Sequence, residues 1–263
     1  MNILYIGDIM GNPGMDVVAK VLPELKKQHQ LDLVIAQGEN VSDGKGMLPE
    51  DMARLQKIGV DFFTGGNHTP KREELKAQLE DPAQPVIGPA NMPSCPGPGW
   101  KYIEAAQGKV LVISILGDTV GNNSPIILNP LEKIDQILKA NAHEQKAATV
   151  VNFHGDFSSE KRVFGYYLDG RVSAVVGDHW HVPTADAMIL PQHTGYISDV
   201  GMCGTLHSSL GVKTDIIIRR WRDHTTEPNA LETEGPLQFN AVLIKVNRKG
   251  LSENIESVHK IIE

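Results

Sequence analysis

Two histidines, His179 and His181, follow the apolar run of residues 172–176 in the segment Gly-Asp-His-Trp-His. Side chains alternate along an extended chain, so both imidazoles are expected on one side of it, with Trp180 facing away. Two neighbouring imidazoles can chelate a metal ion. A lone His-x-His segment is more often a pair of surface or hydrogen-bonded histidines, so the motif indicates a metal site only if other metal-binding residue types lie close to it.

Four further apolar runs end in residues of metal-binding types. These residues are Asp8, Glu39 with Asn40, Asn67 with His68, and His154. Taken singly, Asp8 and Asn67 are easily explained as turn residues, and His154 as a core histidine. Taken together, carboxylate, amide and imidazole groups suit Fe, Mn, Zn or Co. A zinc site with an open position uses about three protein ligands, so this larger set predicts two ions that share a bridging carboxylate.

A pair of metal ions about 3.5–4 Å apart can polarise a phosphoryl group and generate hydroxide from water at neutral pH. The set therefore predicts metal-assisted hydrolysis of a phosphoester. The loop of residues 42–46 could contact phosphate through its backbone amides, but it lacks the Gly-Lys-Ser/Thr spacing of a Walker loop. The sequence has no Gly-x-Ser-x-Gly elbow, and neither Cys95 nor Cys203 has a papain-like context.

The elements that must position these residues follow a β-α-β-α-β order. Apolar runs at residues 3–6, 31–36 and 60–64 alternate with helical patterns at about 17–25, 49–58 and 71–79. This order predicts a parallel sheet with helices on both faces, in which ligands bind outside the carboxyl ends of the strands. Residues far apart in sequence then meet at one edge of the sheet.

The rest of the chain continues the mixed α/β pattern. The predicted elements are a hairpin at 100–104 and 110–116, helices at 130–143 and 158–168, strands at 148–153, 172–176 and 196–199, and an antiparallel pair at 239–246 and 255–262. Residues 211–222 fit either a helix or a strand. We expect one domain over residues 1–263, with a loop-rich segment at about 81–129 that partly covers the site.

Composition limits the partners. The formal net charge is −7 and the pI is near 5.8, so the chain has no global attraction to nucleic acid or to an anionic membrane. A phosphate-bearing ligand then needs a local positive source, such as a metal. No apolar run approaches the ~20 residues of a transmembrane helix, and the N-terminus resembles a strand more than a signal peptide. We expect a cytoplasmic protein with reduced cysteines, no stable nucleic-acid partner, and possible assembly as a homo-oligomer.

The ordered motifs resemble those of calcineurin-like metallophosphoesterases. The motifs are Gly7-Asp8, Gly38-Glu39-Asn40, Gly66-Asn67-His68, Phe153-His154 and Gly177-Asp178-His179-Trp180-His181. More closely, the chain is similar to the bacterial YmdB-type branch from Met1 to about Gly204, including residues 89–91 and 198–202. The resemblance implies a sandwich of β-sheets flanked by helices, with the metal site at the carboxyl ends of the strands. It also implies a phosphodiesterase acting on 2′,3′-cyclic or 3′,5′-cyclic nucleotides.

The resemblance also assigns roles. It implies that Asp8, Glu39, Asn40 and His181 hold one ion, and that Glu39, Asn67, His154 and His179 hold the other. His68 would be the general acid that protonates the leaving oxygen, and not a ligand. Met10 stands where the wider superfamily usually has histidine, and Glu39-Asn40 where Asp is usual; both departures match the YmdB-type branch. The expected metals are Fe or Mn, with Zn or Co as alternatives.

Several alternatives stay open. The same centre could serve a phosphomonoesterase or a nuclease. The chain could also be a regulatory protein that binds nucleotide or metal and whose slow hydrolysis of phosphoesters is incidental. Retention of His68 favours catalysis, because a pure binder needs no general acid. Asp178 is expected to orient a ligand or the backbone. Asp199 could do the same or simply end a strand, and His193 and His207 lie in loops that could approach the site.

Overall fold

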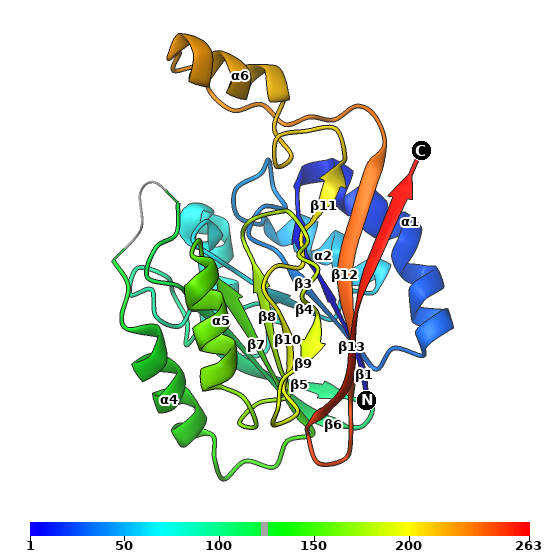
Figure 1. The fold of residues 1–263 in the computed structure, drawn as a ribbon, viewed down its shortest axis with the longest axis vertical. Coiled ribbons are helices and arrows are strands. Elements are labelled where there is room, and N and C mark those ends of the chain that lie inside the picture. Colours follow the sequence, from blue (N-terminus) through cyan, green and yellow to red (C-terminus); the bar gives the residue numbers. More distant parts are fainter. Residues whose placement is uncertain (122–125) are drawn as a thin grey trace.

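The computed structural model describes residues 1–121 and 126–263 of the chain. Two β-sheets stack face to face, and helices cover the outer face of each (Figure 1). The predicted α/β sandwich is therefore confirmed.

The first sheet has a parallel centre. Strands β1 (Asn2–Ile6), β3 (Leu33–Gln37) and β4 (Phe62–Thr64) run parallel, and β12 (Leu237–Val246) joins β1 antiparallel. The sheet is completed by β2 (Asp8–Ile9), β11 (Met202–Thr205) and β13 (Ser252–Ile262). Helices α1 (Gly11–His29) and α2 (Pro49–Ile58) pack on its outer face.

The second sheet has the order β5-β6-β7-β8-β10-β9. Its strands are β5 (Trp100–Ala105), β6 (Gly108–Leu116), β7 (Ala148–His154), β8 (Ala174–Asp178), β9 (Met188–Ile189) and β10 (Gly195–Ile197). Strands β6, β7, β8 and β10 run parallel. Helices α4 (Pro130–Ala140) and α5 (Ser158–Tyr167) cover its outer face.

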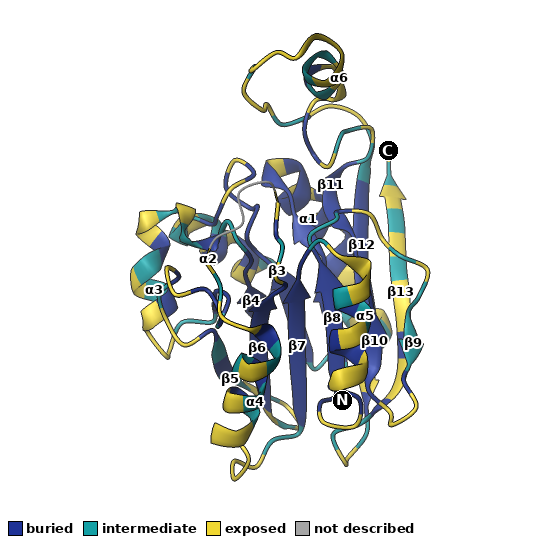
Figure 2. Cartoon of the chain, turned by 60° about the vertical axis from the view of Figure 1, so that its left-hand side comes forward, coloured by how far each residue is buried: buried dark blue, intermediate teal, exposed yellow. Residues whose placement is uncertain are grey.

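Side chains that alternate between the two faces of each strand form three apolar layers, one between the sheets and one under each pair of helices. In β1, Ile3 and Tyr5 point between the two sheets, whereas Leu4 and Ile6 pack under α1 and α2. The second sheet divides its side chains in the same way between the middle layer and the layer under α4 and α5. Figure 2 shows the central strands buried and the exposed residues on the outer sides of the helices. Strands buried on both faces explain the continuous apolar runs of the sequence.

The expectation from the β-α-β order, a parallel sheet with helices on both of its faces, is wrong, because helices cover only the outer face of each sheet. The β-α-β order stops at residues 81–99, a segment crowded with proline and glycine, through which the chain passes to the second sheet without a crossover helix. Strands β6 to β8 then begin a new parallel set, and the two sheets cover one another's inner faces.

The predicted helix over residues 71–79 is also corrected. The segment forms the 3₁₀ turns Thr69–Lys71 and Glu73–Leu75, followed by the short helix α3 (Lys76–Glu80). Arg72 lies between the two turns with extended backbone. Its guanidinium donates to the carbonyls of Ser42 and Lys45, at 2.8 and 2.9 Å. These bonds tie the segment to the loop after β3.

The ambiguous segment 211–222 contains a helix, α6 (Thr214–Asp223). It belongs to an insertion between β11 and β12, residues 206–236, which we call the arm. The helix stands away from the body of the molecule (Figure 1). The arm packs on the body through Val212, Leu231 and Ile217, which contact Met10 and Met202. Trp221 is 82% exposed.

Both cysteines are free and buried, and burial raises the pKa of each thiol to about 12. Among the described residues no helix is long and apolar enough to cross a membrane. The single-domain assignment stays a prediction, as does the covering role of residues 81–129, of which 122–125 lie outside the described residues.

Candidate metal centre

The predicted ligands meet at the edge of the sandwich where the parallel strands of both sheets end. The first sheet supplies Asp8, which begins β2 just after β1, and Glu39, Asn40 and Asn67, which lie in the loops after β3 and β4. The second supplies His154 at the end of β7, and His179 and His181 just after β8. Most of these side chains are buried, and Asp8 and His154 have no exposed surface. The site therefore depends on the packing of two sheets and not on the edge of one.

The first group of side chains surrounds Asn40. Its amide Nδ2 lies 3.2 Å from each of three acceptor atoms: Asp8 Oδ1, Glu39 Oε1 and His181 Nε2. His181 Nε2 is also 3.6 Å from Asp8 Oδ1. These three atoms come from separate segments of the chain, and the lone pairs of all three are directed toward the NH₂ group of Asn40.

The second group surrounds His154. Its Nε2 lies 3.3 Å from Glu39 Oε1 and 3.0 Å from Asn67 Oδ1. The His179 ring packs beside it, with the two ring centroids 4.4 Å apart. One ligand atom each from Glu39, His154 and His179 lie within 4.8 Å of one another. Glu39 belongs to both groups.

Both groups have the chemistry that a transition-metal ion requires. The donor atoms are carboxylate oxygens, an amide oxygen and imidazole nitrogens. In His154 and His181, Nδ1 is already bonded, to Asp178 Oδ1 at 2.7 Å and to the Leu210 carbonyl at 3.1 Å. A partner on Nδ1 fixes the ring and turns Nε2 toward the ligand position. Asn40 is the exception, because Oδ1 reaches the first group only if its amide turns over.

Electrostatics also favour cations here. Burial raises the pKa of Asp8, whereas burial of Glu39 is outweighed by His154 and His68, which lower its pKa. Burial would lower the pKa of His154, but Glu39 and Asp178 raise it well above its usual value. Burial and His154 lower the pKa of His179 to about 4. Burying a charged carboxylate without a counter-charge costs free energy. A protonated histidine or a bound cation can offset this cost.

His179 and His181 reach the two groups for a different reason from the one the sequence suggested. Strand β8 ends at Asp178, and both histidines have left-handed backbone, with φ of 100° and 61°. Alternation along an extended strand therefore does not apply to them. The turn sends His179 toward His154 and His181 toward Asp8. Positive φ is unfavourable for residues other than glycine, so neighbouring contacts must hold the turn.

Asp178 organises the layer beneath the ligands. Its Oδ1 bonds His154, and its Oδ2 accepts from Tyr5, Gln37 and Asn152, at 3.0, 2.9 and 2.5 Å. Every one of these side chains is buried. The predicted orienting role of Asp178 agrees with these contacts. The sequence did not single out its three donors, because buried polar residues inside apolar strands carry no motif.

Lys161 and Asp199 hold the turn that carries the two histidines. Lys161 is 1% exposed, and its Nζ lies 2.9 Å from Asp199 Oδ2 and 4.3 Å from the centre of the Trp180 ring. It also donates to the Asp178 carbonyl. Asp199 Oδ2 accepts from the Trp180 amide at 2.9 Å. Lys161 went unnoticed in the sequence because its helix supplies no motif.

Replacing Lys161 with methionine should lower the free energy of unfolding by about 3–5 kcal/mol, because it leaves the buried Asp199 carboxylate unpaired. Urea denaturation measures the change. Lys139→Met, at an exposed position of α4, is the matched control and should change stability little. A loss under about 1 kcal/mol for Lys161→Met would mean that the ion pair does not hold the turn.

Of the other histidines considered in the sequence, His193 and His207 lie away from the ligand groups and His68 lies beside them. His193 is in the turn before β10, at the amino end of the strands, where its carbonyl accepts from Ser252. His207 is exposed at the start of the arm. His68 lies beside the ligands, with its backbone amide 2.8 Å from Glu39 Oε2 and its Nδ1 2.9 Å from Asn40 Oδ1.

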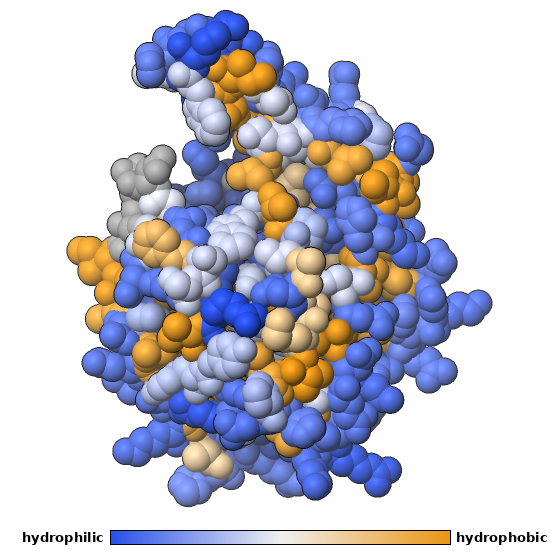
Figure 3. Space-filling model, viewed as in Figure 1, coloured by the Kyte–Doolittle hydropathy of each residue, from blue (hydrophilic) through white to orange (hydrophobic). Residues whose placement is uncertain are grey.

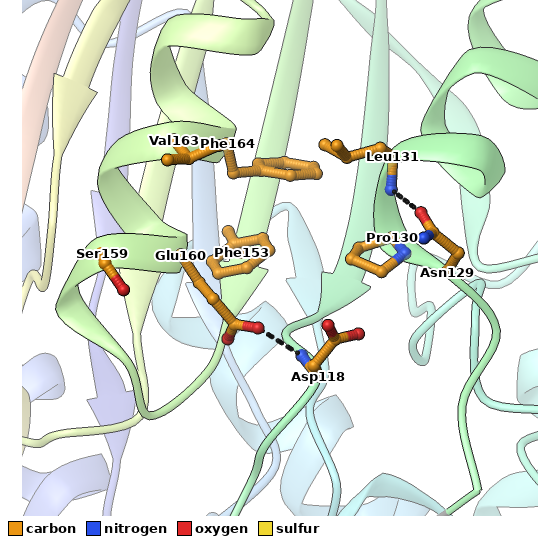
Figure 4. A pocket seen from close by; sticks show the side chains of 9 residues that line it. All are labelled: Asp118, Asn129, Pro130, Leu131, Phe153, Ser159, Glu160, Val163 and Phe164. Carbon is orange, nitrogen blue, oxygen red and sulfur yellow. Dashed lines mark hydrogen bonds between the residues drawn. The ribbon is translucent and has the colours of Figure 1, made fainter.

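A cavity of about 250 Å³ opens on the outer face of the second sheet, between α4 and α5 (Figure 4). Phe153, Phe164 and Leu131 line it, and Glu160 accepts from the Asp118 amide at its lower end. Because neighbouring side chains of β7 point to opposite faces, Phe153 faces this cavity while His154 faces the ligand groups. The cavity is therefore separate from the candidate metal centre.

The two stacked sheets, with acidic and imidazole side chains at their carboxyl ends, define a calcineurin-like phosphoesterase fold. The structure of a 5′-nucleotidase precursor from Thermus thermophilus superposes on this chain with a TM-score of 0.55, over 100% of this chain and 54% of that one. At 13% identity this likeness concerns the fold alone. The chain belongs to the YmdB-like protein family, whose model matches residues 4–258, so the predicted family is confirmed.

Several relatives share nearly the whole chain. A Bacillus subtilis protein named 2′,3′-cyclic-nucleotide 2′-phosphodiesterase is 37% identical over 248 residues, 94% of this chain and 92% of that protein. A hypothetical protein from Thermus thermophilus superposes with a TM-score of 0.90 at 34% identity, over 100% of both chains. A structure described as a novel phosphatase from Mycoplasma pneumoniae superposes with a TM-score of 0.92 at 27% identity, over 100% of this chain and 94% of that one.

Proposed function

We propose that this protein is a metal-dependent phosphoric diester hydrolase that opens 2′,3′-cyclic nucleotides. The observation that carries the proposal is the pair of ligand groups that meet at Glu39. The name of the Bacillus subtilis relative supports the substrate class and the 2′ position of cleavage. In this reaction a water oxygen bonds to phosphorus, the bond from phosphorus to O2′ breaks, and O2′ takes up a proton.

In this proposal Asp8, Glu39, Asn40 and His181 hold one transition-metal ion, and Glu39, Asn67, His154 and His179 hold a second. Iron or manganese are the first candidates, and zinc or cobalt the alternatives. When bound, the ions supply positive charge for the phosphoryl oxygens and lower the pKa of water. That charge offsets the acidic character of the whole chain.

His68 is the proposed proton donor to O2′. Its Nδ1 is bonded to Asn40, which leaves Nε2 to face a ligand, since Nε2 has no hydrogen-bond partner among the described residues. Its side chain is 30% exposed, so a substrate can reach it. Burial, opposed by Glu39 and assisted by nearby cations, lowers the pKa of His68. A more acidic imidazolium gives up its proton more readily.

Metal analysis and a substrate panel test this function. The purified protein should carry about two transition-metal ions per chain and hydrolyse bis(p-nitrophenyl) phosphate and 2′,3′-cyclic nucleotides. Assays with 3′,5′-cyclic nucleotides, phosphomonoesters and RNA test the remaining candidates. These are a phosphodiesterase of 3′,5′-cyclic nucleotides, a phosphomonoesterase and a nuclease. A protein that binds two metals but cleaves none of these esters would be a regulatory binder, and the enzyme proposal would fail.

A further inference from the structure

A cavity of about 710 Å³ separates the arm from the body of the molecule. The body side is formed by Met10 and by Asp43, Gly44 and Lys45 of the loop after β3. The arm side includes Arg220 of α6 together with Pro228, Asn229, Leu231 and Thr233. Figure 3 shows the arm projecting from the body of the molecule. A volume in this range is typical of small-molecule sites.

Three walls of the cavity continue directly from the candidate metal centre. Met10 follows Asp8 by two residues, and the loop with Lys45 follows Asn40. On the arm, the wall begins just after Leu210, whose carbonyl accepts from His181 Nδ1 at 3.1 Å. Lys45 is also one of the charges that lower the pKa of His68. The cavity is therefore lined by the chain segments that follow Asp8 and Asn40 and by the arm that contacts His181.

Two cations in the cavity lack a carboxylate partner. Lys45 is exposed and makes no ion pair or hydrogen bond through its side chain with any described residue. Within the described part of the chain, the Arg220 side chain bonds only the Glu227 carbonyl, through Nε at 2.8 Å and through Nη2. The one acid among the lining residues, Asp43, is paired with Arg72 at 3.1 Å.

The neighbouring arginines of α6 differ from Arg220. Arg219 pairs with Asp215 and Glu227, and Arg222 pairs with Asp223. The charges of Arg219 and Arg222 are thus paired with carboxylates, whereas the charge of Arg220 is available to a ligand in the cavity. In a chain with a net charge of −7, this is a local positive site suited to an anion.

The cavity also has an apolar wall. Met10, Val212 and Leu231 pack together at the base of the arm and line it. Positions 44 and 211 are glycines whose missing side chains leave room for Met10: a Cβ would lie 3.2 Å from its Cε at Gly44, and 2.3 Å from its Cγ at Gly211. An apolar wall beside two cations suits a ligand that combines a base or sugar with a phosphate.

We propose that this cavity binds the substrate beyond its cyclic phosphate and recognises a second phosphate on the 5′ side of the same ribose. The inference rests on the proposed function. The preferred substrate is then a 2′,3′-cyclic nucleotide that carries a 5′ phosphate or phosphodiester, with Lys45 and Arg220 as the residues that bind it. The shared chemistry occurs in a free mononucleotide and at the 3′ end of a short RNA.

Steady-state kinetics test the inference with three substrates: adenosine 2′,3′-cyclic phosphate, its 5′-phosphorylated form, and a diadenosine nucleotide ending in a 2′,3′-cyclic phosphate. The second phosphate should raise kcat/KM about tenfold or more, mainly through KM, because charge-assisted bonds are strong. Arg220→Ala and Lys45→Ala should each bring this ratio toward one. Arg222→Ala, on the same helix but paired with its own neighbour, should keep the wild-type ratio.

Equilibrium dialysis gives a readout that needs no turnover. Adenosine 3′,5′-bisphosphate should bind the wild type about tenfold more tightly than adenosine 3′-monophosphate, and Arg220→Ala should abolish the difference. Melting curves show whether each variant is folded, and Lys45→Ala provides a second test on an exposed loop.

The outcomes separate the two proposals. A wild type that cleaves all three substrates with equal kcat/KM overturns the inference and leaves the function standing. A wild type that cleaves none of them overturns the function. A preference for the phosphorylated mononucleotide alone supports a nucleotide substrate, whereas a preference for the dinucleotide as well supports the end of an RNA chain.

Discussion

Replacing Glu39 with alanine is expected to reduce the bound metal from about two ions to less than one per chain. Glu39 is the carboxylate that belongs to both ligand groups, where its Oε1 lies 3.3 Å from His154 Nε2 and 3.2 Å from Asn40 Nδ2. Its Oε2 also accepts from the His68 amide at 2.8 Å. One truncation therefore opens both groups and releases the loop that carries His68. Turnover of cyclic nucleotides should fall about a thousandfold or more, since metal charge supplies several kcal/mol and about 1.4 kcal/mol is worth a factor of ten.

Elemental analysis and kinetics on the same preparations measure this effect. Glu50→Ala is the matched control, because Glu50 is an exposed acid at the start of α2, and it should keep both ions and normal turnover. If Glu39→Ala retained two ions, Glu39 would not be the bridging ligand. Two separate sites, each complete without it, would then have to replace the assignment.

Replacing His68 with alanine should preserve the metal content and reduce turnover of 2′,3′-cyclic nucleotides about 10²–10⁴-fold, which is the range for loss of a general acid. The ring is not one of the proposed ligands, and the contact of the His68 backbone amide with Glu39 survives the substitution. The loss should be much smaller with bis(p-nitrophenyl) phosphate. Its p-nitrophenolate leaving group departs without protonation, whereas a ribose alkoxide does not.

This dependence on the leaving group distinguishes proton donation from a structural role. A structural defect at His68 would slow both substrates equally, and such a result would contradict the general-acid assignment. His207→Ala, at an exposed histidine of the arm, serves as the control and should leave both rates close to the wild type.

Many residues of the candidate site could be predicted from their types and their order along the chain. An acid, an amide or a histidine directly after a buried strand is recognisable from sequence, because the apolar run and the polar residue that ends it are both local features. Asp8, Glu39, Asn67 and His154 follow this rule, and the structure brings them together. The family could be predicted from the same motifs.

Other parts of the site depend on contacts between distant segments. Tyr5, Gln37 and Asn152 converge on Asp178 from three strands, and Lys161 reaches Asp199 from a helix. No local pattern marks such residues, because each is a polar side chain whose partner lies far along the chain. The arm cavity likewise exists only because residues 206–236 fold back over the loop after β3.

The sequence by itself determined the alternation of strands and helices, the polar residues at the strand ends, and hence the expected chemistry. Only the tertiary structure decided that two sheets share the site, that Glu39 stands between both ligand groups, and that left-handed backbone directs His179 and His181 to different groups. The physical reason is the range of the interactions. Hydrophobic periodicity is a property of a few neighbouring residues, so it can be recognised in the sequence. The stacking of sheets and the contacts that hold a turn with unfavourable backbone angles form only when distant segments pack together.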